Sequence, residues 1–273
     1  MARLTDLSFL PNLRPTRWPT RAFRLTRLAL HVVVGLTVAG LIFSRVSAAG
    51  QDRILRWWGR GVLRALRIVP QVRGVAPALE SAGMLLVSNH ISWLDIFVIQ
   101  AVKPVRFVAK HDIRSWPVLG WLCAQTGTLF IERDRARHAV HVIHAMREHI
   151  KRGVSVGIFP EGGSTLGDHI REFHAALFQA VPEGGAILPV GLRYLDASGQ
   201  PTSAPAYANE ITLAECIRSI LSQSKLVAEL NFEEPIDVSG RSRRERSAQT
   251  QAAIAQRLGL PVRPRETEDA IVT

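Results

Sequence analysis

The amino-acid sequence predicts an α/β fold in which helices flank a mixed β-sheet, preceded by a membrane-associating helical segment at the N-terminus. Two patterns lead to this prediction. After residue 70, short apolar runs alternate with stretches of helical periodicity, as in a sheet that is covered by helices. Before it, several arginines precede an apolar run over residues 28–43, which Arg45 ends. A basic flank beside such a run is typical of a segment that associates with membranes.

Length, charge and cysteine content narrow the class of protein. The chain has 273 residues and a formal net charge of +11. This length allows one catalytic domain with an N-terminal appendage. The charge favours an anionic partner such as a phospholipid surface, a phosphorylated substrate or nucleic acid. The two cysteines, Cys123 and Cys216, exclude a disulfide framework and a four-cysteine zinc site, and they fit a reducing, cytoplasmic-side location.

The N-terminal run predicts membrane attachment. The arginines before it are Arg14, Arg17, Arg21, Arg24 and Arg27. The run is shorter than the roughly 20 apolar residues that a spanning helix needs, so it either crosses with tilt or lies in the interface. If it spans, the basic leader is expected to stay in the cytoplasm. One alternative is a buried amphipathic helix. The other is a secretory signal peptide cleaved near Ala48, although Arg45 interrupts the apolar segment just before that cleavage site.

The rest of the chain divides into helical and strand-like segments. Residues 51–69 carry apolar side chains at helical spacing between arginines and predict an amphipathic helix with a basic face. The predicted strands cover residues 84–87, 105–108, 128–131, 154–159, 187–192 and 226–232. Further helices are expected at 140–150, closed by Gly153, and at 241–258. We therefore expect a basic leader with an anchoring helix (1–49), a catalytic domain (50–260) and a flexible tail (261–273).

Residues 88–95 contain the first candidate catalytic pair, His90 and Asp95. They follow a predicted strand and lead into a predicted helix, and ligands bind at strand ends in α/β sheets. If Ser92 caps the helix, the Asp95 carboxylate in the first turn can reach the His90 imidazole. An imidazole that a carboxylate holds in one tautomer can take a proton from an alcohol near pH 7. The alternative is that Asp95 only completes a capping box with Ser92.

Two further segments end at the same predicted edge of the sheet. In residues 159–165, adjacent glycines leave backbone N–H groups accessible to an anion or a polar head group, and Glu161 can bind an acceptor hydroxyl or organise the loop. Residues 127–133 bring Arg133 to this edge, and its planar guanidinium suits a phosphate. Taken alone, an ordinary turn with proline and glycine and a solvated arginine are the simpler explanations.

These segments, in this order, resemble the signatures of the glycerolipid acyltransferase family, which includes the lysophosphatidic acid acyltransferases. The first signature is Asn-His followed after four residues by Asp, here Asn89, His90 and Asp95. The second resembles residues 127–133, and the third resembles Phe159-Pro160-Glu161-Gly162. The fourth, an apolar strand that holds a proline, resembles Ile187-Leu188-Pro189-Val190. The resemblance covers residues 84–195.

The resemblance implies transfer of a fatty acyl group to the free hydroxyl of a lysolipid, most simply 1-acyl-sn-glycerol-3-phosphate, to give phosphatidic acid in phospholipid biosynthesis. The donor is then acyl-CoA or acyl-carrier protein, a substrate rather than a cofactor. The implied catalytic residues are His90 and Asp95. The implied substrate-binding residues are Arg133, Glu161, Gly162, Gly163 and Ser164, supported by Asn89, Pro160 and Pro189. The implied location is the inner (cytoplasmic) membrane, on anionic phospholipid, with the catalytic domain on the cytoplasmic side.

The third signature departs from the family pattern. Thr, then frequently Arg, often follows its glycine, whereas this chain has Gly163, Ser164 and Thr165. A phosphate contact is thus missing or replaced, and a lyso-ornithine lipid becomes an alternative acceptor.

Three other patterns are set aside. Residues 153–157 match the Gly-x-Ser-x-Gly elbow of serine hydrolases, but Ser155 opens a predicted strand instead of following one. His138, His141 and His144 drift around a helix without a completing carboxylate or cysteine cluster, so no metal site is predicted. No nucleic-acid-binding motif is present. A lipid hydrolase that uses Ser155 and a catalytically silent membrane-binding module remain the competing hypotheses.

Overall fold

The structure, a computed structural model, describes residues 16–77, 83–132, 136–208 and 210–264. Its main feature is a mixed sheet with the strand order β1-β8-β7-β2-β5-β3-β4, and β9 pairs with β7 beyond this path. The strands are β1 (Ile68–Arg73), β2 (Leu85–Ser88), β3 (Arg106–Lys110), β4 (Leu129–Ile131), β5 (Val156–Ile158), β7 (Ala186–Leu195), β8 (Leu226–Phe232) and β9 (Ile236–Asp237). The prediction of an α/β fold with a mixed sheet is confirmed.

Strand direction decides where the functional loops meet. β7, β2, β5, β3 and β4 run parallel to one another, whereas β8 is antiparallel to β7 and parallel to β1. The carboxyl ends of the five parallel strands therefore share one edge of the sheet. This is the edge at which α/β sheets bind their ligands.

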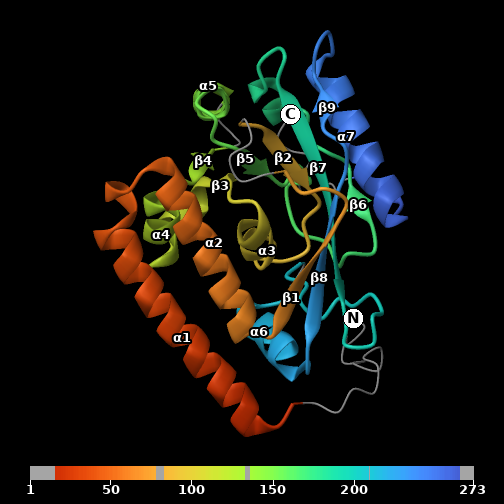
Figure 1. Cartoon of the computed structure of the whole chain (residues 1–273). Coiled ribbons are helices and arrows are strands. Elements are labelled where there is room, and N and C mark those ends of the chain that lie inside the picture. The colour runs from red at the N-terminus through yellow and green to blue at the C-terminus, as the bar shows by residue number, and fades with distance from the viewer. Residues whose placement is uncertain (1–15, 78–82, 133–135, 209, 265–273) are drawn as a thin grey trace.

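Helices cover both faces of the sheet (Figure 1). They are α1 (Trp18–Leu41), α2 (Ala48–Ala65), α3 (Asp95–Val102), α4 (Leu119–Gln125), α5 (Ala136–Lys151), α6 (Leu213–Ser222) and α7 (Arg243–Leu258). The central strand β2 is buried on both faces: Leu86 packs into the core beneath α2, α3 and α6, while Leu85 and Val87 pack into the core beneath α5 and α7. Such two-sided burial explains why residues 84–87 read as one continuous apolar run.

Pro189 lies inside β7, a central strand, where a missing N–H group would ordinarily interrupt a ladder. Here the carbonyl of Pro189 accepts the N–H of Glu233, which lies between the end of β8 and the start of β9. The proline nitrogen faces this same side because the N–H and C=O of one strand residue point alike. The break between β8 and β9 therefore accommodates the proline.

The predicted helix over residues 51–69 is wrong at its C-terminal end. α2 ends at Ala65, and Arg67 adopts a left-handed conformation with φ of 56°, after which Ile68–Arg73 forms the edge strand β1. The apolar spacing through Ile68 continues that of a helix, and only the turn at Arg67 separates the two elements. Likewise the first residues of the expected tail are ordered, since β10 (Val262–Arg263) pairs with β6 (Ile170–Arg171).

Helix α1 packs along α2 and is held at the buried Arg24. Its guanidinium donates hydrogen bonds to the carbonyl oxygens of Leu66, Leu221 and Gln223, which lie at the C-terminal ends of α2 and α6. Farther along, Gly35 meets the ring of Trp58 so closely that any side chain there would overlap it. Trp18–Arg45 is long and apolar enough to cross a membrane, because an 18-residue window within it has a mean hydropathy of 1.9, and few residues of this window are buried.

Candidate active site

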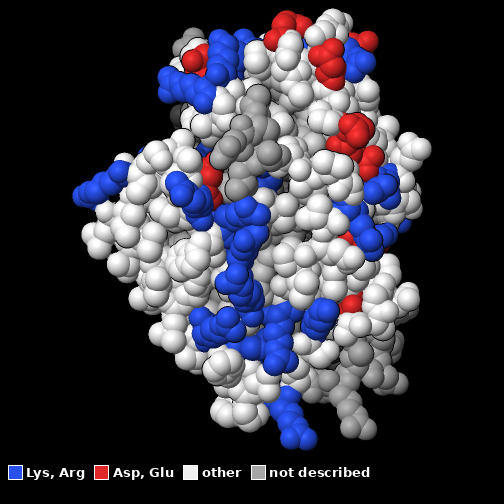
Figure 2. Space-filling view, in the orientation of Figure 1, with Lys and Arg blue, Asp and Glu red and all other residues white. Residues whose placement is uncertain are grey.

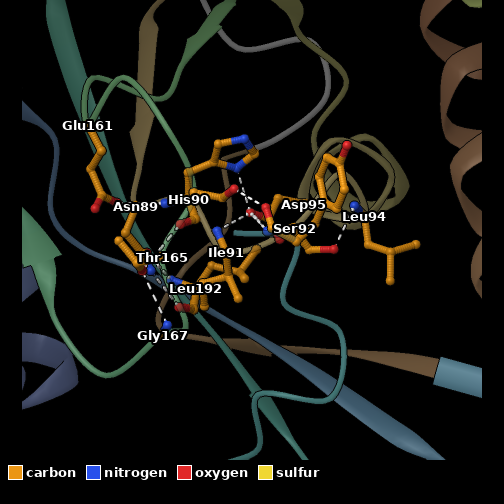
Figure 3. Close-up of polar contacts among 12 residues, drawn as sticks. Asn89, His90, Ile91, Ser92, Leu94, Asp95, Glu161, Thr165, Gly167 and Leu192 are labelled. Atoms are coloured by element: carbon orange, nitrogen blue, oxygen red, sulfur yellow. Dashed lines mark hydrogen bonds and ion pairs between the residues drawn. The ribbon is translucent and has the colours of Figure 1, made fainter. Parts of the chain in front are cut away.

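The His90 and Asp95 side chains meet at the carboxyl edge of the sheet. His90 lies two residues beyond β2, and Asp95 begins α3, so the intervening turn folds the carboxylate back toward the imidazole (Figure 3). The His90 Nδ1 and Asp95 Oδ2 atoms are 2.8 Å apart. The imidazole remains 22% exposed, whereas Asp95 is fully buried. The pair thus combines a reachable ring with a carboxylate that water does not touch.

Asp95 also receives hydrogen bonds from the backbone and from a second side chain. Its Oδ2 atom accepts the N–H groups of Ile91 at 2.7 Å and Ser92 at 2.9 Å. Its Oδ1 atom accepts the hydroxyl of Tyr194 at 2.7 Å. α3 begins at Asp95 with Leu94 as its N-cap and without a side-chain cap, so the expected capping box with Ser92 does not form. Asp95 instead holds the N–H groups of the turn before the helix with the same oxygen that contacts His90.

This arrangement defines the orientation of the imidazole. An ionised carboxylate can only accept hydrogen bonds, so Nδ1–H of His90 donates to Asp95 and the neutral ring carries its free lone pair on Nε2. The ring stacks on Phe159, with centroids 4.2 Å apart, and Phe159 stacks in turn on Phe107. A basic nitrogen is thereby presented beside an apolar aromatic wall.

Glu161 joins the backbone segments of His90 and Arg171. Its Oε1 atom accepts the His90 N–H at 2.7 Å, and its Oε2 atom accepts the Arg171 N–H at 2.8 Å. Burial raises the pKa of Glu161 to about 8, although both N–H donors and the Arg171 charge favour the ionised form. Glu161 therefore fixes the backbone of His90, which corresponds to the loop-organising role among the two expected for it.

The glycine-rich loop after β5 lies directly beside His90. The Thr165 N–H donates to the His90 carbonyl at 2.9 Å, and the Ser164 hydroxyl donates to the carbonyl of Tyr207. Gly162 has a φ of 86°, a conformation that side chains disfavour. A Cβ atom on Gly163 would lie 3.1 Å from an Arg171 guanidinium nitrogen. The loop is therefore tied to its neighbours by both backbone and side-chain hydrogen bonds, and glycine at position 162 permits its conformation.

The three supporting residues hold strands together. Asn89 exchanges two hydrogen bonds with the backbone of Leu192 on β7, at 2.9 and 2.7 Å. Pro160 accepts the N–H of His174, and Pro189 lies opposite Val87 in the β2–β7 ladder. The Asn89 and Pro189 contacts fix β2 relative to β7, and the Pro160 contact ties the loop after β5 to the segment after β6 (Ile170–Arg171).

Of the remaining residues named from the sequence, one is not described by the structure and one lies away from the site. Arg133 falls outside the described residues. Ser155 precedes β5, at the amino ends of the parallel strands and hence at the opposite edge from His90. Within the described residues, no group of three or more His, Cys, Asp or Glu side chains could hold a metal ion.

Sequence patterns missed two residues of this site. Tyr194 was beyond the predicted end of its strand, and its contact with Asp95 spans 99 positions of the chain. Arg171 belongs to the two-residue strand β6, which is too short to leave a periodic signal. The sequence offered one indication of Tyr194: it lies two positions after Leu192 and therefore on the same face of an apolar strand.

Comparisons with known proteins agree with this fold and identify the family. A family model described as Acyltransferase matches residues 67–193. The chain is 40% identical over 78% of its length to the 1-acyl-sn-glycerol-3-phosphate acyltransferase of Neisseria meningitidis serogroup B, of which 83% is covered. It is 32% identical over 90% of its length to the lyso-ornithine lipid O-acyltransferase of Pseudomonas aeruginosa, of which 96% is covered.

A solved structure shares the fold. The crystal structure of the 1-acyl-sn-glycerophosphate (LPA) acyltransferase, PlsC, from Thermotoga maritima superposes with a TM-score of 0.65 at 19% identity, covering 88% of this chain and 94% of that one. The protein therefore belongs to the acyltransferase family. Within that family it is an O-acyltransferase of the kind that acts on lysolipids, related to the 1-acylglycerol-3-phosphate and lyso-ornithine lipid enzymes.

Proposed function

We propose that the protein transfers a fatty acyl group from a thioester to the free hydroxyl of 1-acyl-sn-glycerol-3-phosphate, with His90 as the general base. The observation that carries this proposal is the His90–Asp95 pair, whose atoms lie 2.8 Å apart at the carboxyl edge of the sheet. A base of this kind is what an alcohol requires, because a hydroxyl is a poor nucleophile until its proton is removed.

The chemistry proceeds by direct transfer. Nε2 of His90 takes the proton of the acceptor hydroxyl as its oxygen attacks the thioester carbonyl carbon, and Asp95 stabilises the resulting imidazolium. The tetrahedral oxyanion forms beside the loop after β5, where we propose that backbone N–H groups or nearby polar residues stabilise it. The carbon–sulfur bond then breaks, and the imidazolium returns its proton to the departing thiolate. No acyl-enzyme forms.

The acceptor is the finer part of the proposal. The relative at 40% identity, an enzyme named for 1-acyl-sn-glycerol-3-phosphate, supports the glycerophosphate acceptor. A lyso-ornithine lipid is the second candidate. It is favoured by Gly163, Ser164 and Thr165, which place no cation directly after Gly162, and by the near full-length match to an enzyme named for that acceptor. For the donor we propose acyl-carrier protein or coenzyme A thioester, bound as a substrate.

We further propose that the protein works on an anionic membrane surface, the inner membrane with the catalytic domain on the cytoplasmic side. Figure 2 shows a band of Lys and Arg side chains down the middle of one face, where α2 lies in Figure 1. Arg56, Arg60 and Arg64 lie one helical turn apart, and their mutual repulsion adds to burial in lowering the pKa of Arg60. Such a row of cations is suited to phospholipid head groups.

The apolar part of this membrane contact is proposed to be α1 with the adjoining α4. Phe23, Leu30 and Val33 on α1 are exposed, as are Trp116 and Trp121 at α4. Arg24 holds α1 against the ends of α2 and α6, so one side of α1 is committed to the catalytic domain. This favours an α1 that lies in the interface over one that crosses the bilayer.

The test is an acyl-transfer assay with the full-length protein in detergent. Labelled acyl-CoA and acyl-carrier protein are each offered with lysophosphatidate and with lyso-ornithine lipid. We expect the higher kcat/KM with lysophosphatidate. A product formed only from lyso-ornithine lipid would overturn the proposed acceptor and leave the transfer reaction standing.

The same assay separates transfer from hydrolysis. A hydrolase that uses Ser155 would release free fatty acid and would lose activity in Ser155→Ala. We expect this variant to retain acyl transfer, because Ser155 lies at the amino edge of the sheet. Release of free fatty acid without acylated lipid would contradict the transfer mechanism.

A further inference from the structure

We infer that Tyr194 is a positioning residue for the His90–Asp95 pair: its hydroxyl holds the second oxygen of Asp95 and thereby sets the pH at which the pair takes up a proton. The inference rests on the proposed roles of His90 and Asp95. It adds a residue from a different strand, outside the motifs that the sequence displays.

The geometry places the Tyr194 hydroxyl on the one carboxylate oxygen that the loop does not serve. Oδ2 of Asp95 receives three donors, from His90, Ile91 and Ser92. Oδ1 receives Tyr194 Oη at 2.7 Å. The tyrosine is 2% exposed and Asp95 is fully buried, so no water competes for this oxygen.

The position of this hydroxyl is set by the sheet. Tyr194 lies two residues after Leu192 on β7, and both backbone groups of Leu192 are bonded to the Asn89 side chain, the residue before His90. The segment that carries His90 and the carboxylate of Asp95 are thus both hydrogen-bonded to β7. A carboxylate held at both oxygens cannot rotate about χ2, so the imidazole keeps one orientation and one tautomer.

The titratable groups around Asp95 come from four elements. His90 belongs to its own loop, Tyr194 to β7, Glu161 to the loop after β5, and Cys216 to α6. Burial and the Asp95 charge raise the pKa of Tyr194, and burial raises that of Cys216, so both stay protonated near neutral pH. Tyr194 is therefore a permanent donor to Asp95.

The effect on the pair has a defined sign. When the pair takes up a proton, His90 becomes an imidazolium that the Asp95 carboxylate stabilises, and a hydrogen bond from Tyr194 to Oδ1 withdraws part of the negative charge that does so. Removing this hydrogen bond makes proton uptake by the pair easier, and the acidic limb of the kcat/KM profile moves to higher pH. The hydroxyl contacts Asp95 and not the substrates, so KM should change little while kcat falls.

The first test compares Tyr194→Phe with Thr250→Val, a matched control. Thr250 is also fully buried, and its hydroxyl donates to the Arg246 carbonyl at 2.7 Å within α7, away from the site. For Tyr194→Phe we expect kcat about tenfold lower, equal to about 1.4 kcal/mol, with the acidic limb raised by about one pH unit. Thr250→Val should keep the wild-type profile. A Tyr194→Phe profile that superimposes on wild type would overturn the inference.

A second readout does not depend on activity. Imidazole ¹⁵N resonances follow the titration of His90, which is assigned by its absence from His90→Ala. We expect the His90 midpoint to rise in Tyr194→Phe and to stay unchanged in Thr250→Val. An unchanged His90 midpoint in Tyr194→Phe contradicts the positioning role, whether or not the protein turns over an acceptor. A shifted midpoint in a protein that turns over no acceptor would support the positioning role and contradict the proposed function.

A third variant covers the case in which Tyr194→Phe does not fold. The sequence has two tyrosines, so in Tyr207→Phe a fluorinated tyrosine enters position 194 alone. Fluorination makes the hydroxyl a stronger donor without removing it. We expect the acidic limb to move to lower pH than in unfluorinated Tyr207→Phe. No movement, or movement to higher pH, would contradict the inference.

Discussion

At the scale of the residue, Asp95 explains why a short motif can be both structural and chemical. One oxygen of its carboxylate accepts two backbone N–H groups of the turn before α3 and also holds the His90 ring. A buried carboxylate is costly unless such donors surround it. The turn therefore supplies the donors that allow a buried carboxylate to orient a base.

Asp95→Asn tests this double role. An amide at this position can still accept a hydrogen bond, but it lacks the charge that stabilises the imidazolium and it can reverse the tautomer of His90. We expect kcat to fall by about a hundredfold or more, within the range that general acid–base catalysis supplies. Steady-state kinetics measure the loss, and circular dichroism checks that the variant is folded. Unchanged kcat in a folded variant would exclude an orienting role.

Glu161 predicts a pH dependence of stability. Its pKa is raised from 4.5 to about 8 in the folded protein. Between these values the unfolded chain releases a proton that the folded protein retains, so the free energy of unfolding falls as the pH rises through this window. Glu161→Gln cannot ionise and should flatten the dependence of Tm on pH between about 5 and 8.

The control for this measurement is Glu172→Gln, which changes an exposed glutamate close to the same loop. It should retain the wild-type slope of Tm against pH. Equal slopes for wild type and Glu161→Gln would show that Glu161 titrates alike in the folded and unfolded states.

At the scale of the element, the sequence predicts what is locally determined. All six apolar runs are strands in the structure, because burial on one or both faces imposes the composition of each run. β1 was missed because its first apolar residue, Ile68, continues the helical spacing of α2, and the change of element depends on one left-handed residue, Arg67.

The candidate site shows the same division. His90 and Asp95 are five positions apart, so their contact follows from local geometry and was expected. The contact of Tyr194 with Asp95 and that of Glu161 with His90 depend on strand order, since β2 lies between β5 and β7. The spacing of residues in the sequence does not reveal which strands are neighbours in the sheet.

Arg24→Met tests how α1 is attached. The substitution removes the guanidinium that donates to the carbonyls at the ends of α2 and α6. Buried carbonyls without donors cost roughly 1–3 kcal/mol each, so we expect a lower Tm and faster proteolysis within α1. Arg27→Met, which changes an exposed cation of the same helix, is the control. Equal Tm and cleavage in the two variants would contradict the attachment.

At the scale of the whole molecule, charge and apolar surface are arranged around α1 and α2. The cations of Figure 2 follow α2, and the exposed apolar side chains of α1 and α4 lie beside them. α7 covers the other face of the sheet (Figure 1). One surface of the protein thus combines positive charge with exposed apolar side chains, and both favour binding to anionic membranes.

Two double variants with the same charge change test this assignment. Arg27→Gln/Arg64→Gln removes cations beside α1 and α2, where both residues line a basic hollow, and Arg243→Gln/Arg244→Gln removes exposed cations of α7. At roughly 1 kcal/mol per cation near an anionic surface, the first should bind anionic vesicles about thirtyfold more weakly. The α7 variant should bind as wild type does. Co-sedimentation measures both, and equal losses would show that position does not matter.

The measurement that bears most directly on this account is acyl transfer by wild type and His90→Ala side by side, with labelled acyl-CoA or acyl-carrier protein and lysophosphatidate. We predict acylated product from wild type and a rate at background in the variant, whose folding is checked by its Tm. Undiminished transfer by a folded His90→Ala protein would contradict the proposal that His90 removes the proton of the acceptor.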